Sequence, residues 1–377
     1  MHSNKIVSAV FAAAFGAGLL FLPAVSAQGA MTGLQYCLLI LVPSLFPFMA
    51  LSTYLVKSGI SDSLGKALGP ITRLLFRLPG CAAATILMSM VGGFPVGARG
   101  IAALHQQGSI TDREAGRMIS FCVNAGPAFV ITVVGVGMLG NISAGVVLLC
   151  AQLAASVLLG IILGFLDKTP VFSTAVPQAK KSQSPLIDST VDAARGTMNL
   201  CAFVILFSVL IALLRETGIA GVLAHFLLRF GLPPAVCGSA ISVLMEVTGG
   251  CFDIAVLGGS GVLFAFAMGW GGLCVHFQVL SSVTKIPFSR SRFFFHQLIK
   301  GCFSAFFAIV LFQFFPQAAP VFQNTSEALS GKLSGSPAAA GALVALCIVL
   351  LCSVGAEKLE FKKKSCYNKN KSNAFNG

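Results

Sequence analysis

Apolar residues occur along this chain in long continuous stretches that polar and charged segments separate. Runs of about 20 apolar residues are expected of helices that cross a bilayer, because a rise of 1.5 Å per residue then spans a hydrocarbon core about 30 Å thick. In lipid every backbone polar group must be paired within a helix or a closed barrel, and the ten-residue alternation of barrel strands is not seen here. The pattern therefore predicts an all-α, polytopic membrane protein.

Two apolar segments are broken near their middle. Residues 81–104 are interrupted at Gly92-Gly-Phe-Pro-Val-Gly97, and residues 235–257 at Thr248-Gly-Gly250. Each flank has about eleven residues, or roughly 16 Å of helix, which reaches half a bilayer. Two further apolar segments, residues 119–139 and 258–283, carry comparable breaks, at Asn124-Ala-Gly-Pro127 and Gly269-Trp-Gly-Gly272.

The order of segments in the first half recurs in the second half. Each half holds a span, an amphipathic stretch, two broken segments and a final span. Short motifs match as well: Ser58-Gly-Ile60 with Thr217-Gly-Ile219, Leu78-Pro79 with Leu232-Pro233, and Met88-Ser-Met-Val-Gly-Gly93 with Met245-Glu-Val-Thr-Gly-Gly250. We infer a duplicated unit, residues 31–166 and 197–317, joined by a polar connection at 167–196.

The charge pattern decides between two topologies. The formal net charge is +13, and Lys and Arg gather between the apolar runs, where the positive-inside rule places them in the cytoplasm. If the segments broken at 92–97 and 248–250 both crossed the membrane, the basic 167–196 connection would lie outside. If both are re-entrant hairpins, nearly every basic cluster lies inside. We therefore predict inverted repeats with about eight transmembrane helices, two re-entrant helical hairpins and both termini in the cytoplasm.

The ends of the chain add two further predictions. Residues 1–28 are either a first transmembrane helix or a cleaved signal, because an apolar run is followed by Val25-Ser-Ala27, and we favour the retained helix. A C-terminal transmembrane helix is expected at 338–355, followed by a basic cytoplasmic tail at 356–377.

Composition excludes several classes of protein. With 56% hydrophobic and 10% charged residues, the chain is not a water-soluble globular enzyme. No folded basic domain is present to bind nucleic acid. The twelve cysteines include no C-x-x-C pair, so neither a disulfide framework nor a metal site is expected. No P-loop, H-E-x-x-H or G-x-S-x-G motif occurs, and we expect no cofactor and no catalytic residue.

Carboxylates beside the second hairpin tip are the main candidates for function. Glu246 and Asp253 flank its glycines, and an ionisable residue inside the membrane is a functional hypothesis by default. Each also has a structural alternative, a hydrogen bond to a half-helix end for Glu246 and a helix cap for Asp253. Inverted-repeat transporters bind their ligands where such tips and breaks meet. The expected ligand-binding residues are Ser89, Gly92, Gly93, Asn124, Glu246, Thr248, Gly249, Gly250, Asp253, His276 and Gln278.

Two of these candidates carry explicit alternatives. His276 inside the membrane is a ligand or a packed, hydrogen-bonded core residue. Asn124 either binds a ligand or ties a broken helix to its neighbour. The sequence leaves both alternatives open.

Four motifs in order resemble the family of the sporulation integral membrane protein YlbJ: Leu41-Val-Pro-Ser-Leu-Phe-Pro-Phe48, Gly92-Gly-Phe-Pro-Val-Gly-Ala-Arg99, Ile110-Thr-Asp-Arg-Glu-Ala115 before Asn124-Ala-Gly-Pro127, and Gly271-Gly-Leu-Cys-Val-His-Phe-Gln278. The similarity covers about residues 31–315. The Gate, or nucleoside-recognition, domain of this family is shared with spore maturation proteins, ferrous-iron transport protein B and, more distantly, concentrative nucleoside transporters.

The resemblance implies a multi-pass protein of the cytoplasmic membrane of an endospore-forming bacterium, with a ligand between residues 92–97 and 246–253. We expect a sporulation protein that moves or binds a small polar solute (nucleoside-like, an ion or a precursor), with sodium or proton coupling through Glu246. A non-transporting assembly factor for the spore envelope or cortex is the alternative, and an enzyme acting on a lipid-linked precursor is a third. The expected partners are the bilayer, the solute, and either a second copy or a sporulation membrane complex.

Overall fold

The structure, a computed structural model, describes residues 2–58, 60–167 and 184–318. Within these ranges every regular element is a helix and no strand occurs. Five helical segments there are long and apolar enough to cross a membrane: Pro23–Leu55, Ile142–Leu166, Pro185–Glu216, Gly261–Ser282 and Arg290–Phe314. The chain is therefore an all-α, polytopic membrane protein, which confirms the fold class that the apolar pattern predicts.

The described helices that are long and apolar enough to cross a membrane are fewer than the eight predicted crossings. The N-terminal helix α1 (His2–Phe21) has an apolar part, Ala9–Phe21, that is shorter than a full span. The segment predicted at 119–139 is divided between two helices. The predicted helix at 338–355 and the tail at 356–377 lie outside the described residues. The number of crossings and the domain boundaries stay predictions.

The described helices after α1 follow one order twice. In each series a long helix is followed by a short helix, two half-length helices, a second pair of half-length helices and a long helix. The first series is α2 (Pro23–Gln35), η1 (Tyr36–Leu41), α3 (Val42–Lys57), α4 (Ile60–Phe76), α5 (Ala82–Val91), α6 (Phe94–Gln106), α7 (Asp112–Phe121), η2 (Ala128–Met138) and α8 (Ile142–Leu166). The second is α9 (Pro185–Glu216), α10 (Ile219–Leu228), α11 (Pro234–Met245), α12 (Val247–Val256), α13 (Gly261–Trp270), α14 (Gly272–Ser282) and α15 (Arg290–Phe314), after which a 3-10 turn, η3, covers Pro316–Ala318.

The helix pairs α5–α6 and α11–α12 fold back on themselves. A Cβ atom built on Gly100 of α6 would lie 2.8 Å from Cγ2 of Thr85 in α5. A Cβ atom built on Gly238 of α11 would lie 2.7 Å from Cδ1 of Leu257, just past α12. Contacts between residues so far apart in sequence require antiparallel helices. Neither broken segment therefore passes straight through as one ordinary helix.

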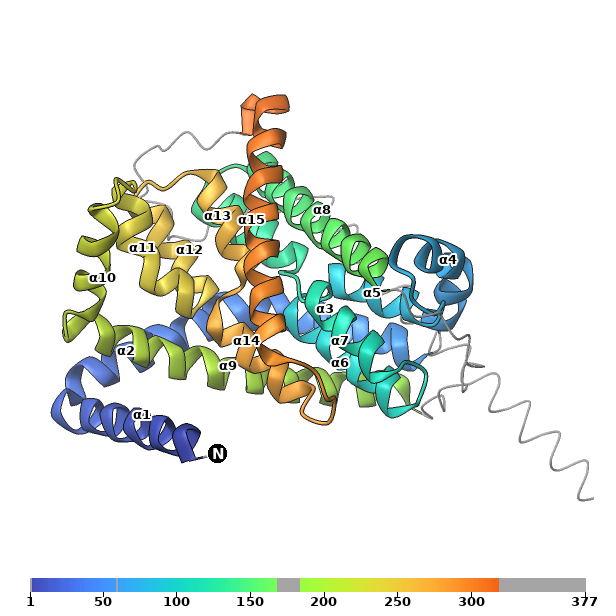
Figure 1. The fold of residues 1–377 in the computed structure, drawn as a ribbon, viewed down its shortest axis with the longest axis horizontal. Helices are drawn as coiled ribbons and strands as arrows, with labels where there is room; N and C mark the ends of the chain where they lie inside the picture. Colours follow the sequence, from blue (N-terminus) through green and yellow to red (C-terminus); the bar gives the residue numbers. More distant parts are fainter. Residues whose placement is uncertain (1, 59, 168–183, 319–377) are drawn as a thin grey trace, which may run out of the picture. The chain divides into compact units, whose positions relative to one another are not determined.

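Corresponding elements of the two series contact one another. Helix α9 packs on α2 and α3, and helix α15 packs on α8 and α13, as Figure 1 shows for the orange α15. Reciprocal contacts join the hairpins to the opposite series, since α6 contacts α14 and α12 contacts η2. In each series, the second helix of the hairpin thus contacts the second helix of the broken pair in the other series. Such reciprocal contacts are expected when two similar halves are related by a pseudo-two-fold axis.

The two prolines of the first span produce a wide helical turn. Pro43 and Pro47 predict a kink in the span at residues 31–56. The observed helix begins earlier, at Pro23, and contains the π-helical turn η1, which ends at Leu41, two residues before Pro43. A proline has no N–H to donate to the carbonyl four residues earlier, and its ring crowds that carbonyl. A π turn moves the hydrogen bonds one residue further and so accommodates the ring.

Helix α9 begins earlier than the hydropathy indicates. It starts at Pro185 rather than near Thr197, so the predicted connection at 167–196 is partly helical. Proline is favoured at the first helical position, because its missing N–H has no intrahelical partner there. The added turns tie other elements together: Lys57 Nζ of α3 lies 2.5 Å from Asp192 Oδ2, and Arg99 Nη1 of α6 donates to Asp192 O over 2.9 Å.

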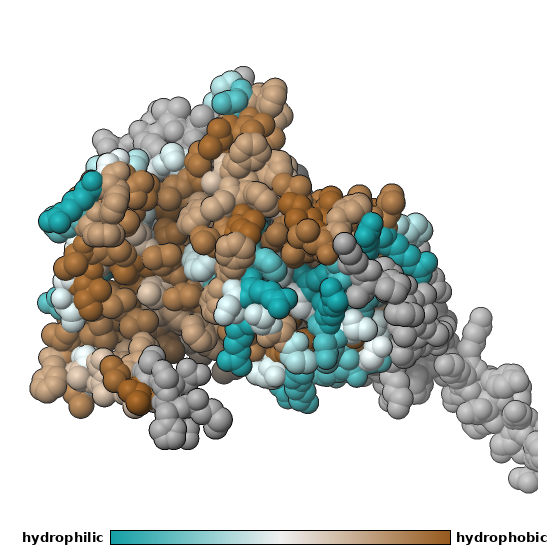
Figure 2. Space-filling view, in the orientation of Figure 1, coloured by the Kyte–Doolittle hydropathy of each residue, from teal (hydrophilic) through white to brown (hydrophobic). Residues whose placement is uncertain are grey.

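Polar residues gather at one part of the surface. In Figure 2 most of the visible face is hydrophobic, and hydrophilic residues collect over α6, α7 and the loop before α15. Arg113 of α7, Lys285 of the loop, and Arg290 and Arg292 at the start of α15 are exposed, and α7 contacts α15. Two basic clusters that the positive-inside rule assigns to one side of the membrane therefore lie near each other.

Candidate functional site

The two hairpin tips and the two helix breaks meet in one place. A Cβ atom on Gly93, at the first tip, would lie 3.4 Å from Gly126 N at the first break. A Cβ atom on Gly272, at the second break, would lie 3.0 Å from Glu246 N at the second tip. A Cβ atom on Gly271 would lie 3.3 Å from Cε1 of the Phe94 ring in the first hairpin. Gly93, Gly271 and Gly272 have φ values of 83°, 83° and 78°, which favour glycine.

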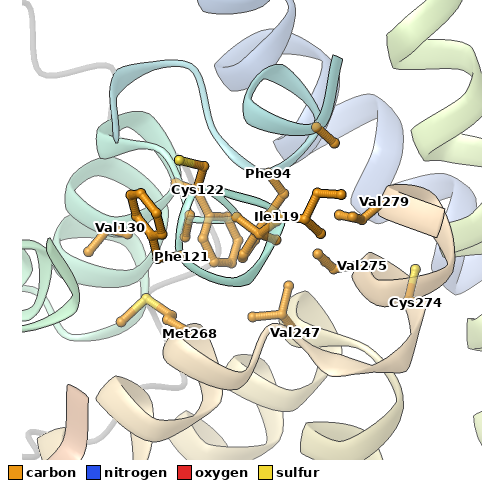
Figure 3. Close-up of a cluster of buried hydrophobic side chains, with 14 of the residues drawn as sticks. Phe94, Ile119, Phe121, Cys122, Val130, Val247, Met268, Cys274, Val275 and Val279 are labelled. Carbon is orange, nitrogen blue, oxygen red and sulfur yellow. The ribbon is translucent and has the colours of Figure 1, made fainter. Parts of the chain in front are cut away.

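A small cavity of about 30 Å³ lies at this meeting point. It is enough for one or two water molecules. Figure 3 shows Phe94, Val247 and Val275 of this region in one buried cluster with Ile119 and Phe121 of α7. The cavity lining comes from both series: Leu41, Leu45, Gly93, Phe94, Gly126, Phe129, Leu200, Val204, Glu246, Val247, Thr248, Val275 and Gln278.

Glu246 is held in place by the N-terminus of α12, the second helix of its own hairpin. The residue is extended (φ −148°, ψ 128°) and ends α11, while its carboxylate caps α12. Oε1 accepts from Thr248 N over 2.8 Å and Oε2 accepts from Gly249 N over 2.6 Å. The positive end of the helix dipole stabilises this buried carboxylate, whose residue is 1% exposed. The structural alternative named for Glu246, a hydrogen bond to a half-helix end, is thus observed.

A second, larger cavity lies on the other side of Glu246. Its volume is about 270 Å³, and we call it the vestibule. The vestibule is lined by residues of α2, η1, α9, α11 and α12: Gln28, Gly29, Thr32, Tyr36, Ser208, Ile211, Ala212, Arg215, Ser242, Glu246, Gly249 and Asp253. Glu246 lines both cavities and therefore forms part of the wall between them.

Asp253 belongs to the vestibule and is paired there. Its carboxylate accepts from the Arg215 guanidinium, which also donates to Ser242 Oγ over 2.8 Å. The Arg215 side chain is 51% exposed, against 17% for Asp253. Asp253 lies inside α12, whose N-cap is Glu246, so the cap suggested for Asp253 is not the role that the structure gives it.

The other predicted site residues divide into two groups. Thr248 and Gln278 line the small cavity with Glu246 and Gly93, and Gly249 lines the vestibule. Gln278 Nε2 lies 3.3 Å from Cys274 Sγ, and its Oε1 has no hydrogen-bond partner among the described residues. The residues that line neither cavity are Ser89, Gly92, Gly250, Asn124 and His276.

Side chains outside the cavities make structural contacts. Asn124 donates to Phe121 O over 3.1 Å and accepts from Ser156 Oγ of α8, so it ties the first break to a neighbouring helix. His276 Nε2 lies 2.8 Å from Trp270 O, and its ring packs edge-on against Trp270 and Phe293. For Asn124 and His276 the structural alternatives are the ones that the geometry shows.

Several polar residues of this region are missing from the sequence-based set. Arg215 and Tyr36 line the vestibule, and Lys300, Gln297 and Gln152 are wholly buried beside the first break. Lys300 could have been identified from the sequence, because it is the one Lys or Arg in the apolar run 293–315. Among the described residues, no group of three or more His, Cys, Asp or Glu side chains is placed to hold a metal ion.

Comparison with known proteins agrees with the resemblance. Residues 38–142 match the Gate family, described as nucleoside recognition. The chain is 27% identical over 340 residues to the sporulation integral membrane protein YlbJ of Bacillus subtilis strain 168, which covers 82% of this chain and 83% of that protein. No solved structure matches significantly. The chain is thus an integral membrane protein similar to YlbJ, and its residues 38–142 are similar to the Gate family.

Proposed function

We propose that this protein binds and moves a small polar solute through the membrane during sporulation, with Glu246 at the binding position. The observation that carries the proposal is that Glu246 lines both cavities, at the point where hairpin tips and helix breaks of two similar halves meet. Secondary transporters built from inverted repeats bind their ligands at such a point. The similarity to YlbJ supports the sporulation role.

The vestibule supports a particular kind of solute. Its volume of about 270 Å³ is near the lower end of the roughly 300–1,000 Å³ usual for small-molecule sites. It combines acceptors on Glu246 and Asp253 with donors on Arg215, Tyr36 and Thr32. A compact solute rich in hydroxyl or amino groups fits this lining, and a long acyl chain does not. The repeats would then rock so that the solute reaches the small cavity and the other face.

The substitution Glu246→Gln tests the binding position. It keeps the size of the side chain and removes the charge that faces both cavities. We expect a loss of at least about tenfold in affinity, which is 1.4 kcal/mol, for whichever compound binds in a panel of nucleosides, amino sugars and cell-wall precursors. The measurement is equilibrium binding to purified protein, with flux in proteoliposomes for the compound that binds.

The matched control is Glu216→Gln, which removes an exposed carboxylate at the end of α9 that lines neither cavity. It should bind as the wild type does. Both variants must elute as monodisperse protein before they are compared. Unchanged binding by Glu246→Gln would remove Glu246 from the site and leave the proposal without its central residue.

A structural or assembly factor for the spore envelope is the second candidate, and one feature of the site favours it. Glu246 is already satisfied by two backbone N–H groups, as a purely structural cap would be. Complementation of a sporulation defect separates the two candidates. A carrier with Glu246→Gln inserts normally and fails to restore spores, whereas a scaffold with the same substitution restores them.

A further inference from the structure

Lys300 is a charged residue in the interior of the protein. It lies in the middle of α15 and is 0% exposed. An ammonium group inside a membrane protein is costly unless it is paired. In the described part of the chain Lys300 forms no ion pair with a carboxylate. The ammonium instead donates to the backbone carbonyl of Val123, in the unwound segment 122–126 at the first break.

The unwound segment exposes several acceptors, and neighbouring helices supply the donors. Gln297 Nε2 of α15 donates to Ser120 O over 3.1 Å, and Gln152 Nε2 of α8 donates to Ala125 O over 2.9 Å. Residues Gln152, Gln297 and Lys300 are all 0% exposed. Such carbonyls are the groups that unwound membrane helices offer to monovalent cations.

Three side-chain oxygens on residues around Lys300 are buried without a hydrogen-bond partner in the described ranges. Gln152 Oε1, Gln297 Oε1 and Ser304 Oγ are buried and have no hydrogen-bond partner among the described residues. Gln297 and Ser304 lie three residues before and four after Lys300 on α15, so all three share one face of the helix. Buried oxygens without a partner around one positive charge are typical of a cation site.

Lys300 also lies beside the second break. A Cβ atom on Gly269 would lie 3.1 Å from Lys300 O and 2.8 Å from Ser304 Cβ. The backbone of α15 therefore packs on the second broken helix, while the Lys300 side chain reaches the first. One residue thus joins the two discontinuities at the level where the hairpin tips meet them.

We propose that the first break is a monovalent-cation site that this chain fills with its own cation, the Lys300 ammonium. The tethered ammonium occupies the position among the carbonyls of segment 122–126 that a sodium ion would otherwise take. It follows that a free sodium ion does not bind at the first break of the wild-type protein.

The test removes the tethered cation and offers a free one. Lys300→Ala opens a space that ends at the carbonyls, whereas Lys300→Met removes the charge and keeps that space filled. The melting temperature of purified full-length protein is measured in choline, sodium, potassium and methylammonium chloride at equal ionic strength. Choline is too bulky for the space and provides the baseline.

For Lys300→Ala we expect a fall of roughly 5 °C or more in choline and recovery of at least about half of it in one of the three small cations. Wild type and Lys300→Arg should melt alike in all four salts, and Lys300→Met should fall without recovery. If too little folded Lys300→Ala protein can be purified in choline to measure a melting temperature, the readout becomes its yield of monodisperse protein after solubilisation in each salt. The same melting temperature or yield of Lys300→Ala in all four salts would overturn the proposal. Because the readout is folding, the result is independent of any solute transport.

Discussion

At the scale of single residues, the two carboxylates of the second hairpin differ in what surrounds them. Glu246 is 1% exposed and accepts two backbone hydrogen bonds, whereas Asp253 pairs with an Arg215 side chain that is 51% exposed. Sequence alone identified both residues, since charge is rare in apolar runs. It missed Lys300 although the same signal was present. It named the helix cap of Glu246 only as an alternative to ligand binding, because a cap depends on where the chain becomes extended.

The difference between the carboxylates predicts unequal stability effects. Glu246→Ala removes a helix cap, which costs about 0.5–2 kcal/mol, and leaves two buried N–H groups unpaired. Asp253→Ala breaks an ion pair with a half-exposed partner, and such pairs contribute about 0–1 kcal/mol. We expect Glu246→Ala to lower the melting temperature in detergent clearly more than Asp253→Ala does. A larger fall for Asp253→Ala would show that the Arg215 pair, rather than the cap, holds the second hairpin.

At the scale of elements, the existence of four breaks was predictable, and the position of one of them was not. Glycine or proline lies at or beside every break, because both weaken a helix interior. The second hairpin nevertheless breaks at the extended Glu246, and the predicted break Thr248-Gly-Gly250 lies inside α12. The π turn before Pro43 and the start of α9 at Pro185 were not predictable from hydropathy, since a helix can continue through polar residues when other elements pair them. Asp192 illustrates this, as it is bound by Lys57 and Arg99 from distant helices.

The close packing of the first hairpin on the first break gives a prediction for one glycine. A Cβ atom on Gly97 would lie 1.9 Å from Cys122 O, which is backbone of the unwound segment. Gly97→Ala must therefore push hairpin and break apart, and overpacking of this kind costs typically about 1–3 kcal/mol. We expect a lower melting temperature.

The control glycine for this prediction is Gly221 in α10, where a Cβ atom would meet nothing within 4 Å. Alanine is favoured over glycine inside a helix by roughly 0.5–1 kcal/mol, so Gly221→Ala should leave the melting temperature unchanged or raise it. If the two variants change stability in the same direction and by the same amount, the contact between Gly97 and Cys122 does not restrain the hairpin.

At the scale of the whole molecule, the sequence shows that the order of segments repeats, and the structure adds that the hairpin tips and helix breaks of both halves meet. The offset between matching motifs predicts two similar halves, and the order of helices repeats accordingly. Which tip approaches which break depends on contacts between distant segments, such as Gly93 with Gly126 and Gly272 with Glu246. The position of Lys300 between the two breaks depends on how α15 packs against other helices, and no local sequence pattern encodes this packing.

The basic clusters give a last prediction, on sidedness. Positive-inside topology places the exposed loop before α15 in the cytoplasm and the turn after α10 outside. Ser291→Cys and Gly231→Cys, both at exposed positions, place a thiol on each side. In right-side-out cells, a membrane-impermeant maleimide should label Gly231→Cys above the parent protein and leave Ser291→Cys at the parent level until the membrane is opened. Equal labelling of both in sealed cells would mean that the two positions share a side. An even number of crossings would then separate the two positions, which contradicts a re-entrant α11–α12 hairpin followed by one crossing of α13 and α14.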